Sequence, residues 1–315
     1  QGWGTVNGAL EETYKTVDEY KAVIAYVDGN GKAVDWLYDG VTVLGHSSTK
    51  DDGAYIYVAG KTPANKNDWQ QWLDHVFHYT HEGEVVNMDA LDQAAAKAKA
   101  EMVEAGILTQ AEADEYVIPV KLAVYPALYN QAGWGSVSQK VAVTKAEDGS
   151  LSFEISDQTT SCDFTLAGNG QDVNAALSAR ASAYYWYMKL AEEMFSEKNY
   201  KNISLNGYYY YNELADTTND PLVEDSIKLY NMLVDYIAAE KNYEKLYSYW
   251  IPYYTAEGYK KWESYGFDYA VMQPNAYGYG QDRLNMAADF AYFYGLGIEM
   301  EWMGSNINGY KETFL

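Results

Sequence analysis

The sequence predicts an α/β fold, and within that class a (β/α)8 barrel of the TIM type. Apolar runs with strand character alternate with helical patterns along the last third of the chain, and such alternation is typical of a parallel sheet. The length of 315 residues suits one large barrel. Two of the strand-like runs stop at glutamates, and the carboxyl ends of barrel strands are where such folds hold their chemistry.

The first two-thirds of the chain contain three expected strands and three expected helices. The strands are buried apolar runs bounded by Gly, Pro or Asp, and they cover 21–27, 40–45 and 117–124. The helices follow a helical spacing of apolar residues and have recognisable stops such as Gly106, and they cover 67–78, 88–105 and 172–198. Residues 130–170 interrupt this rhythm, with a hairpin expected to turn at Asp148-Gly149. We predict a rim insertion there, within a single catalytic domain that spans 1–315.

The rest of the chain alternates regularly. Strands are expected at 203–211, 245–252, 267–272 and 296–302, and helices at 222–239, 256–265 and 283–294. These strands bring the total to seven, whereas a closed barrel needs eight. The barrel is therefore expected to be distorted or incomplete at its last strand, unless a strand lies hidden in 130–170.

Composition and charge exclude several classes of function. The formal net charge is −23, which disfavours nucleic acid because phosphate binding requires clustered Lys and Arg. No apolar run is long enough to span a bilayer, so no membrane insertion is expected. No signal peptide is visible at Gln1. The single cysteine, Cys162, excludes an internal disulfide and a zinc site of several cysteines.

Aromatic residues are unusually abundant, with 33 tyrosines and nine tryptophans. An aromatic ring offers an apolar face, and Tyr and Trp add a polar edge. Sugar rings have C–H faces and hydroxyl edges, so these side chains suit a carbohydrate groove, although many of them are expected to fill the core. An oligosaccharide or polysaccharide is therefore the expected partner.

Two acidic strand ends form the candidate catalytic pair. One run ends at Glu213 and the other carries Glu299 and Glu301. Glycosidic bonds are cleaved by one protonated carboxyl, which expels the leaving oxygen, and one ionised carboxylate, which attacks carbon or activates water. Aromatic neighbours favour the protonated form of a carboxyl, so Glu213 is predicted to be the acid/base. Glu301 is predicted to be the nucleophile because it lies nearer the end of its strand, and Glu299 is the alternative.

These residues also carry two resemblances. Asn212-Glu213 on a fourth expected strand, followed by a glutamate on a seventh, is similar to clan A retaining glycoside hydrolases. Four blocks in order resemble the bacterial domain of unknown function family 4855: 207–213, 250–254, 266–275 and 297–301. The second resemblance implies a barrel enzyme acting on carbohydrate, secreted or held at a bacterial cell surface. The doubled Glu299 and Glu301 and the missing eighth strand depart from the clan A pattern.

Other polar and aromatic residues follow the expected strands and could line the same mouth. Amide groups both donate and accept hydrogen bonds, which suits sugar hydroxyls, and tyrosine or tryptophan rings can stack on sugar faces. The candidate substrate-binding residues are Asn212, Tyr209, Tyr211, Trp250, Tyr253, Gln273, Asn275, Tyr277, His46 and Trp36.

Three other functions remain open: a non-catalytic carbohydrate-binding barrel, a surface protein that presents the barrel rim to another protein, and a metal-dependent hydrolase. The hypothesis of a metal-dependent hydrolase depends on His75, His78 and His81. These histidines lack the spacing of four residues at which zinc-binding helices place their two histidines. We therefore expect no metal and no cofactor. Retention is expected over inversion, although the sequence does not give the separation of the carboxyls.

Overall fold

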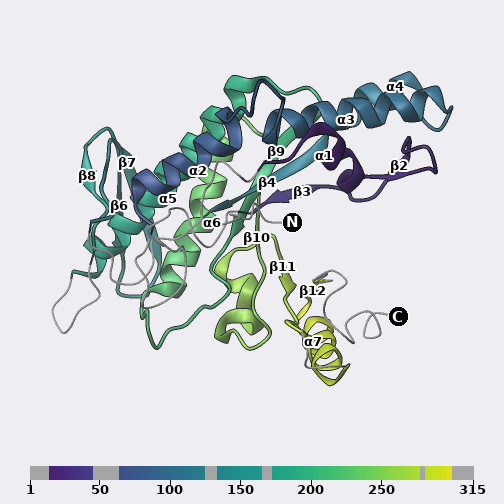
Figure 1. Cartoon of the computed structure of the whole chain (residues 1–315). Helices are drawn as coiled ribbons and strands as arrows, with labels where there is room; N and C mark the ends of the chain where they lie inside the picture. The colour runs from purple at the N-terminus through teal and green to yellow at the C-terminus, as the bar shows by residue number, and fades with distance from the viewer. Residues whose placement is uncertain (1–13, 45–63, 125–132, 165–171, 277–280, 300–315) are drawn as a thin grey trace. The chain divides into compact units, whose positions relative to one another are not determined.

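The computed structural model of the chain describes residues 14–44, 64–124, 133–164, 172–276 and 281–299. These residues form two compact units. Unit 1 contains the described residues up to 123, together with 133–135 and 186–207, and unit 2 contains the others. Helix α5 (Val173–Lys198) and strand β9 (Ile203–Tyr210), both labelled in Figure 1, each contribute residues to both units.

The described residues contain six strands of one parallel sheet, hydrogen-bonded in the order β12-β11-β10-β9-β4-β3. Besides β9 they are β3 (Val41–Val43), β4 (Ile118–Val124), β10 (Tyr247–Trp250), β11 (Tyr269–Met272) and β12 (Gly297–Ile298). The order has two ends, β3 and β12, which do not pair with each other. The predicted (β/α)8 barrel is therefore wrong: the described fold is mixed α/β with an open sheet, and no complete barrel is present in it.

The first expected strand, 21–27, explains part of this error. Thr16 and Glu19 form a capping box that starts helix α1 (Val17–Ile24). Tyr20 and Ile24, spaced by four, are its buried residues along with Lys21. Only β1 (Ala25–Val27) is a strand, and it pairs antiparallel with β2 (Ala33–Trp36) in a separate two-stranded sheet. The apolar run was thus a helical face, and the parallel sheet loses one expected strand.

Most other expected elements are confirmed. In unit 1, α2 (Lys66–His78) and α3 (Asn87–Glu104) match the expected helices, and α3 buries a stripe of small residues that includes Ala90, Ala94 and Ala98. A short helix, α4 (Gln110–Glu115), was not expected, although Thr109 and Glu112 form a capping box at its start. This capping signal is visible in the sequence.

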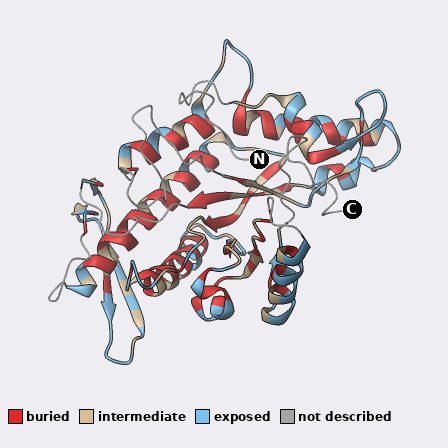
Figure 2. Cartoon of the chain, turned by 60° about the horizontal axis from the view of Figure 1, so that its bottom comes forward, coloured by how far each residue is buried: buried red, intermediate tan, exposed pale blue. Residues whose placement is uncertain are grey.

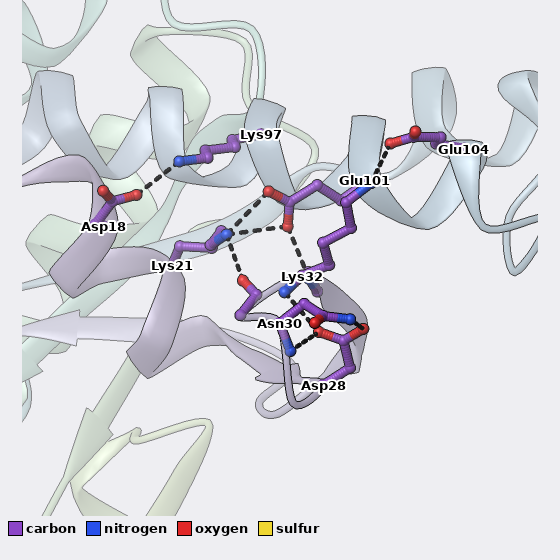
Figure 3. Close-up of polar contacts among 10 residues, drawn as sticks. Asp18, Lys21, Asp28, Asn30, Lys32, Lys97, Glu101 and Glu104 are labelled. Carbon is purple, nitrogen blue, oxygen red and sulfur yellow. Dashed lines mark hydrogen bonds and ion pairs between the residues drawn. The ribbon is translucent and has the colours of Figure 1, made fainter.

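A network of ion pairs fastens the β1–β2 turn to α3 within unit 1 (Figure 3). Lys21 Nζ lies 2.9 Å from Glu101 Oε1, and both side chains are largely buried, at 9% and 15% exposure. The same carboxylate accepts the Ala33 N–H at 2.7 Å. Burial by itself raises the pKa of Glu101, but the Ala33 and Lys21 hydrogen bonds outweigh it and hold that pKa below its ordinary value. The pair therefore stabilises the fold only while Glu101 is ionised.

In unit 2 the expected hairpin is confirmed as β6 (Lys140–Lys145) and β7 (Leu151–Ser156), with Gly149 at φ 84° in its turn. Three N–H groups of β6 donate to side chains one helical turn apart on α5: Ser182, Ser178 and Asn174. These bonds occupy donors of a strand edge that would otherwise be open. Figure 2 shows exposed residues along the hairpin, whereas strand β9 is largely buried. Two short strands, β5 (Ser136–Val137) and β8 (Thr160–Ser161), pair antiparallel nearby.

The remaining helices of unit 2 also follow the expected order. Helix α6 (Val223–Glu240) and helix α7 (Gln281–Tyr294) are α-helical, while η2 (Glu257–Tyr265) is 3-10 helical and ends at Gly266 with φ 90°. Between α5 and the start of α6 lies a buried ion pair, Arg180 with Asp220, at 2.6 and 2.9 Å.

Candidate functional site

The candidate site lies in unit 2, where β9, β10, β11 and β12 end. Main-chain hydrogen bonds continue past the strands and keep the following segments adjacent. Tyr253 N donates to Glu213 O at 3.1 Å, Gln273 N to Pro252 O at 2.9 Å, and Glu299 N to Met272 O at 2.9 Å. Because parallel strands end at one edge of a sheet, the segments that carry the predicted residues lie at that edge. The sequence predicted these residues around the mouth of a barrel, whereas the described structure has them where the strands of an open sheet end.

Two carboxylates act on a single buried phenol at this edge. Tyr209, on β9, is 2% exposed. Burial is the main reason that the pKa of Tyr209 is raised well above its ordinary value, and the charges of Glu213 and Glu299 raise it further, together with Tyr249 and Tyr211. Coulombic effects decline with distance. Glu213 and Glu299, 86 residues apart in the sequence, therefore both lie within electrostatic range of Tyr209, whose hydroxyl stays protonated at neutral pH.

Both carboxyl-bearing residues are partly shielded from water. Glu213 is half-buried in the loop after β9. Glu299 is also half-buried, but its Oε2 atom is screened from solvent.

A ladder of stacked tyrosines underlies the site, and sequence reasoning identified only its first member. The ring of Tyr209 stacks on Tyr249 with centroids 4.9 Å apart, and Tyr249 stacks on Tyr269 at 5.3 Å. Tyr211 meets Tyr209 edge to face at 5.6 Å. The signal in the sequence was the alternation of Tyr247, Ser248, Tyr249 and Trp250, which places the two tyrosines on one face of β10. Cross-strand aromatic contacts of this kind rigidify the sheet beneath the acids.

Amide and phenol groups cluster beside the acids. Asn275 donates from Nδ2 to the hydroxyl of Tyr253 at 2.9 Å, and it adopts a φ of 44°, which is uncommon for a residue with a side chain. Arg283, which sequence reasoning missed, donates to the Asn275 carbonyl at 2.7 Å and lies 4.5 Å from the Tyr254 ring centroid. Gln273 is half-buried on the neighbouring turn. The constrained Asn275 thus links the turn after β10 to the start of α7.

Two of the predicted binding residues make contacts that support the loop after β9. Trp250 is fully buried, with its ring stacked on Phe267 at 5.7 Å, and it donates from Nε1 to the Asn212 carbonyl at 2.7 Å. The side chain of Asn212 accepts from Leu214 N at 3.1 Å. Both residues shape the loop that carries Glu213 and hold it against β10.

Of the four other predicted residues, one belongs to unit 1 and three lie outside the described residues. Trp36 belongs to β2 in unit 1, where its ring stacks on Tyr116 with centroids 4.7 Å apart. His46, Tyr277 and Glu301 lie outside the described residues.

The histidines of the metal alternative lie in or just after α2. His75 is buried with its ring 4.6 Å from Tyr79, His78 lies 3.3 Å from Asp74, and His81 stacks on Tyr14 at 4.1 Å. Among the residues that the structure describes, no group of three or more His, Cys, Asp or Glu is placed to hold a metal ion. The described helices also include none with the length and apolar character needed to cross a membrane.

Comparison with known proteins identifies the family but no activity. The model of the family described as Domain of unknown function (DUF4855) matches residues 5–314. The chain therefore belongs to this family, as the four sequence blocks indicated. Searches of curated proteins and of solved structures each returned no match.

Proposed function

We propose that this protein is a glycoside hydrolase that uses two carboxylates at the end of the parallel sheet in unit 2. The observation that carries the proposal is the arrival of Glu213 and Glu299 at one edge of the sheet, where main-chain hydrogen bonds join the segments that follow the strands. The charges of both residues raise the pKa of the Tyr209 phenol at that edge. This arrangement supports a pair of acids within one site, which is the equipment that glycosidic cleavage requires. The surrounding phenols and amides supply groups that bind sugar hydroxyls.

In the proposed reaction Glu213 protonates the leaving oxygen while a carboxylate from the β12 end attacks the anomeric carbon. Glu213 then deprotonates water, which releases the sugar from the glycosyl-enzyme intermediate with retention of configuration. Glu301, which the sequence predicts as the nucleophile, lies outside the described residues, and Glu299 is the candidate among the described ones. The protonated Tyr209 hydroxyl can donate a hydrogen bond to the ionised carboxylate, which would stabilise its charge.

The test is digestion of a panel of oligosaccharides and polysaccharides by the wild-type protein and by Glu213→Gln, Glu299→Gln and Glu301→Gln. We expect wild-type turnover, a loss of roughly 10²–10⁴-fold in Glu213→Gln, and a comparable or larger loss in only one of the other two variants. Glu244→Gln is the matched control, because Glu244 is an exposed glutamate of the same unit. Its activity should equal that of the wild type.

Azide, added as an external nucleophile, distinguishes the acid/base residue from the catalytic nucleophile. With a Glu213→Ala variant it should attack the glycosyl-enzyme intermediate and give a glycosyl azide of retained configuration. With an alanine variant of the nucleophile, azide should attack the substrate directly and give the inverted product. Full activity in Glu213→Gln would refute the assignment. Glycan binding with no wild-type turnover would favour the alternative of a non-catalytic carbohydrate-binding protein.

We also propose that the protein acts outside the cytoplasm, secreted or at a bacterial cell surface, because polymeric glycans do not cross a membrane unaided. Fractionation of the native cells should recover the chain in the medium or on the cell surface. Recovery in the cytoplasm would refute this location without bearing on the chemistry.

A further inference from the structure

A hollow of about 430 Å³ lies in unit 1. Its lining comes from α3, from α4 and from the turn before β9: Ala96, Lys99, Ala100, Val103, Gln110, Ala113, Asp114, Lys201 and Asn202. The four α3 residues follow the spacing i, i+3, i+4, i+7, so they form one stripe of the helix. Small side chains along this stripe leave the space open.

Lys99 is a buried lysine in the wall of this hollow. The residue is only 7% exposed, and its Nζ donates to Asn202 Oδ1 at 3.2 Å. No carboxylate oxygen of the described residues lies within 4.0 Å of that ammonium group; Asp92 and Asp114 act on it only at longer range. A buried lysine usually has an ion-pair partner. Lys99 instead presents its remaining N–H donors in the wall of an open hollow.

The partner of Lys99 is itself held in place. Asp92 accepts the main-chain N–H of Asn202 at 2.7 Å and the Asn202 side-chain amide at 3.3 Å. The amide nitrogen is thereby turned to Asp92, which leaves Oδ1 for Lys99. The ammonium position is therefore fixed by Asp92 and Asn202 before any ligand arrives, which lowers the entropic cost of binding.

The charges around the hollow define the ligand. Lys99 and Lys201 are cationic and Asp114 is anionic, so the lining carries one net positive charge. Asp114 already accepts from the Gln110 amide at 2.8 Å. One carboxylate would balance the net positive charge of the lining. A dianion would add a second negative charge without a counterion, and Asp114 and the net charge of the whole chain, −23, would repel it.

The apolar part of the lining defines the rest of the ligand. Ala96, Ala100 and Val103 extend over about 10 Å of helix, at ~1.5 Å per residue, and Ala113 faces the same hollow from α4. An aliphatic chain of a few carbons would cover such a stripe. We propose that this hollow binds a small organic monoanion, with its carboxylate on Lys99 and its aliphatic body along the α3 stripe.

Calorimetric titration of the whole protein with butyrate and hexanoate tests the proposal, with 1-butanol as the uncharged probe and inorganic phosphate as the multiply charged one. We expect both carboxylates to bind and butanol and phosphate to bind at least about tenfold more weakly. Lys99→Met, which keeps most of the apolar side chain and removes its charge, should weaken the affinity for butyrate about 10- to 100-fold. Lys97→Met removes the same charge two residues earlier on α3, from an exposed pair with Asp18, and should leave butyrate binding unchanged.

A second variant tests the same site independently, in case Lys99→Met fails to fold. Ala100→Trp fills the hollow from an exposed position of α3 while keeping every charge, and it should also abolish butyrate binding. Equal binding by the wild type and Lys99→Met, or the absence of butyrate binding below about 10 mM, would overturn the proposal. Tighter binding of phosphate than of butyrate would overturn the assignment to a monoanion.

Discussion

The buried ion pair between Arg180 and Asp220 supports the sharpest prediction about stability. The two side chains are 1% and 6% exposed, and the guanidinium donates twice to the carboxylate, at 2.6 and 2.9 Å. Arg180 also donates to Ser226 Oγ at 2.8 Å. The perturbation is Asp220→Asn, which preserves the volume of the side chain and removes only its charge.

The magnitude follows from the burial. Asp220→Asn leaves the Arg180 charge in the interior without its counterion, and losing one member of a buried pair costs about 3–5 kcal/mol. At 1.36 kcal/mol per factor of ten, the unfolding equilibrium constant rises roughly 10²–10⁴-fold. That is a large share of the ~5–15 kcal/mol that stabilises a typical folded domain. We therefore expect the variant to be strongly destabilised.

The assay is urea unfolding followed by tryptophan fluorescence and near-ultraviolet circular dichroism, with the free energy of unfolding extrapolated to water. The matched control is Asp235→Asn, since Asp235 on α6 is 70% exposed and lies 3.7 Å from Lys245. It should change stability by no more than about 1 kcal/mol. A loss below about 1 kcal/mol in Asp220→Asn would show that the buried charge is compensated elsewhere and would refute the reasoning.

Three other predictions concern single positions. Gly258→Ala should destabilise by about 1–3 kcal/mol, because a Cβ there would meet Ala215 Cβ at 2.7 Å; thermal unfolding of Gly258→Ala beside the wild type measures it, and an unchanged midpoint contradicts it. Asn242 has a φ of 58°, so Asn242→Ala should be less stable than Asn242→Gly by about 1 kcal/mol, as urea unfolding of the two variants would reveal; the reverse order counts against it. Because the pKa of Glu101 is lowered in the folded chain, its contribution is complete above its unfolded pKa and is lost as the pH falls through the folded value. Glu101→Gln should therefore flatten the loss of stability under acid, as urea unfolding at several pH values would measure, and an acid limb as steep as that of the wild type would exclude this role of Glu101.

Local signals in the sequence predicted most elements because their causes are local. The α3 helix follows from a run of Ala, Lys and Glu ended by Gly106, and the hairpin follows from Asp148-Gly149 between alternating residues. The error at 21–27 has the same origin, because an apolar run fits a helical face as well as a strand. The capping box at Thr16 and Glu19 would have distinguished them.

The arrival of several candidate residues at one edge of the sheet was predictable, whereas their contacts were not. Glu213, Gln273 and Glu299 follow parallel strands, so their arrival at one edge of the sheet was implied by the strand pattern. The burial of Trp250 on Phe267 could not be predicted, because the alternation of a strand does not say which of its faces meets the core.

The amino-acid order alone determined the alternation of strands and helices, the family and the acids at the strand ends, since each depends on neighbours within a few residues or on short motifs. Tertiary structure decided that the six described parallel strands form an open order, because closure depends on pairing between strands far apart in the chain. It also decided that Glu213 and Glu299 act on one phenol and that Lys99 faces a hollow, since burial and long-range charge exist only once distant segments have packed.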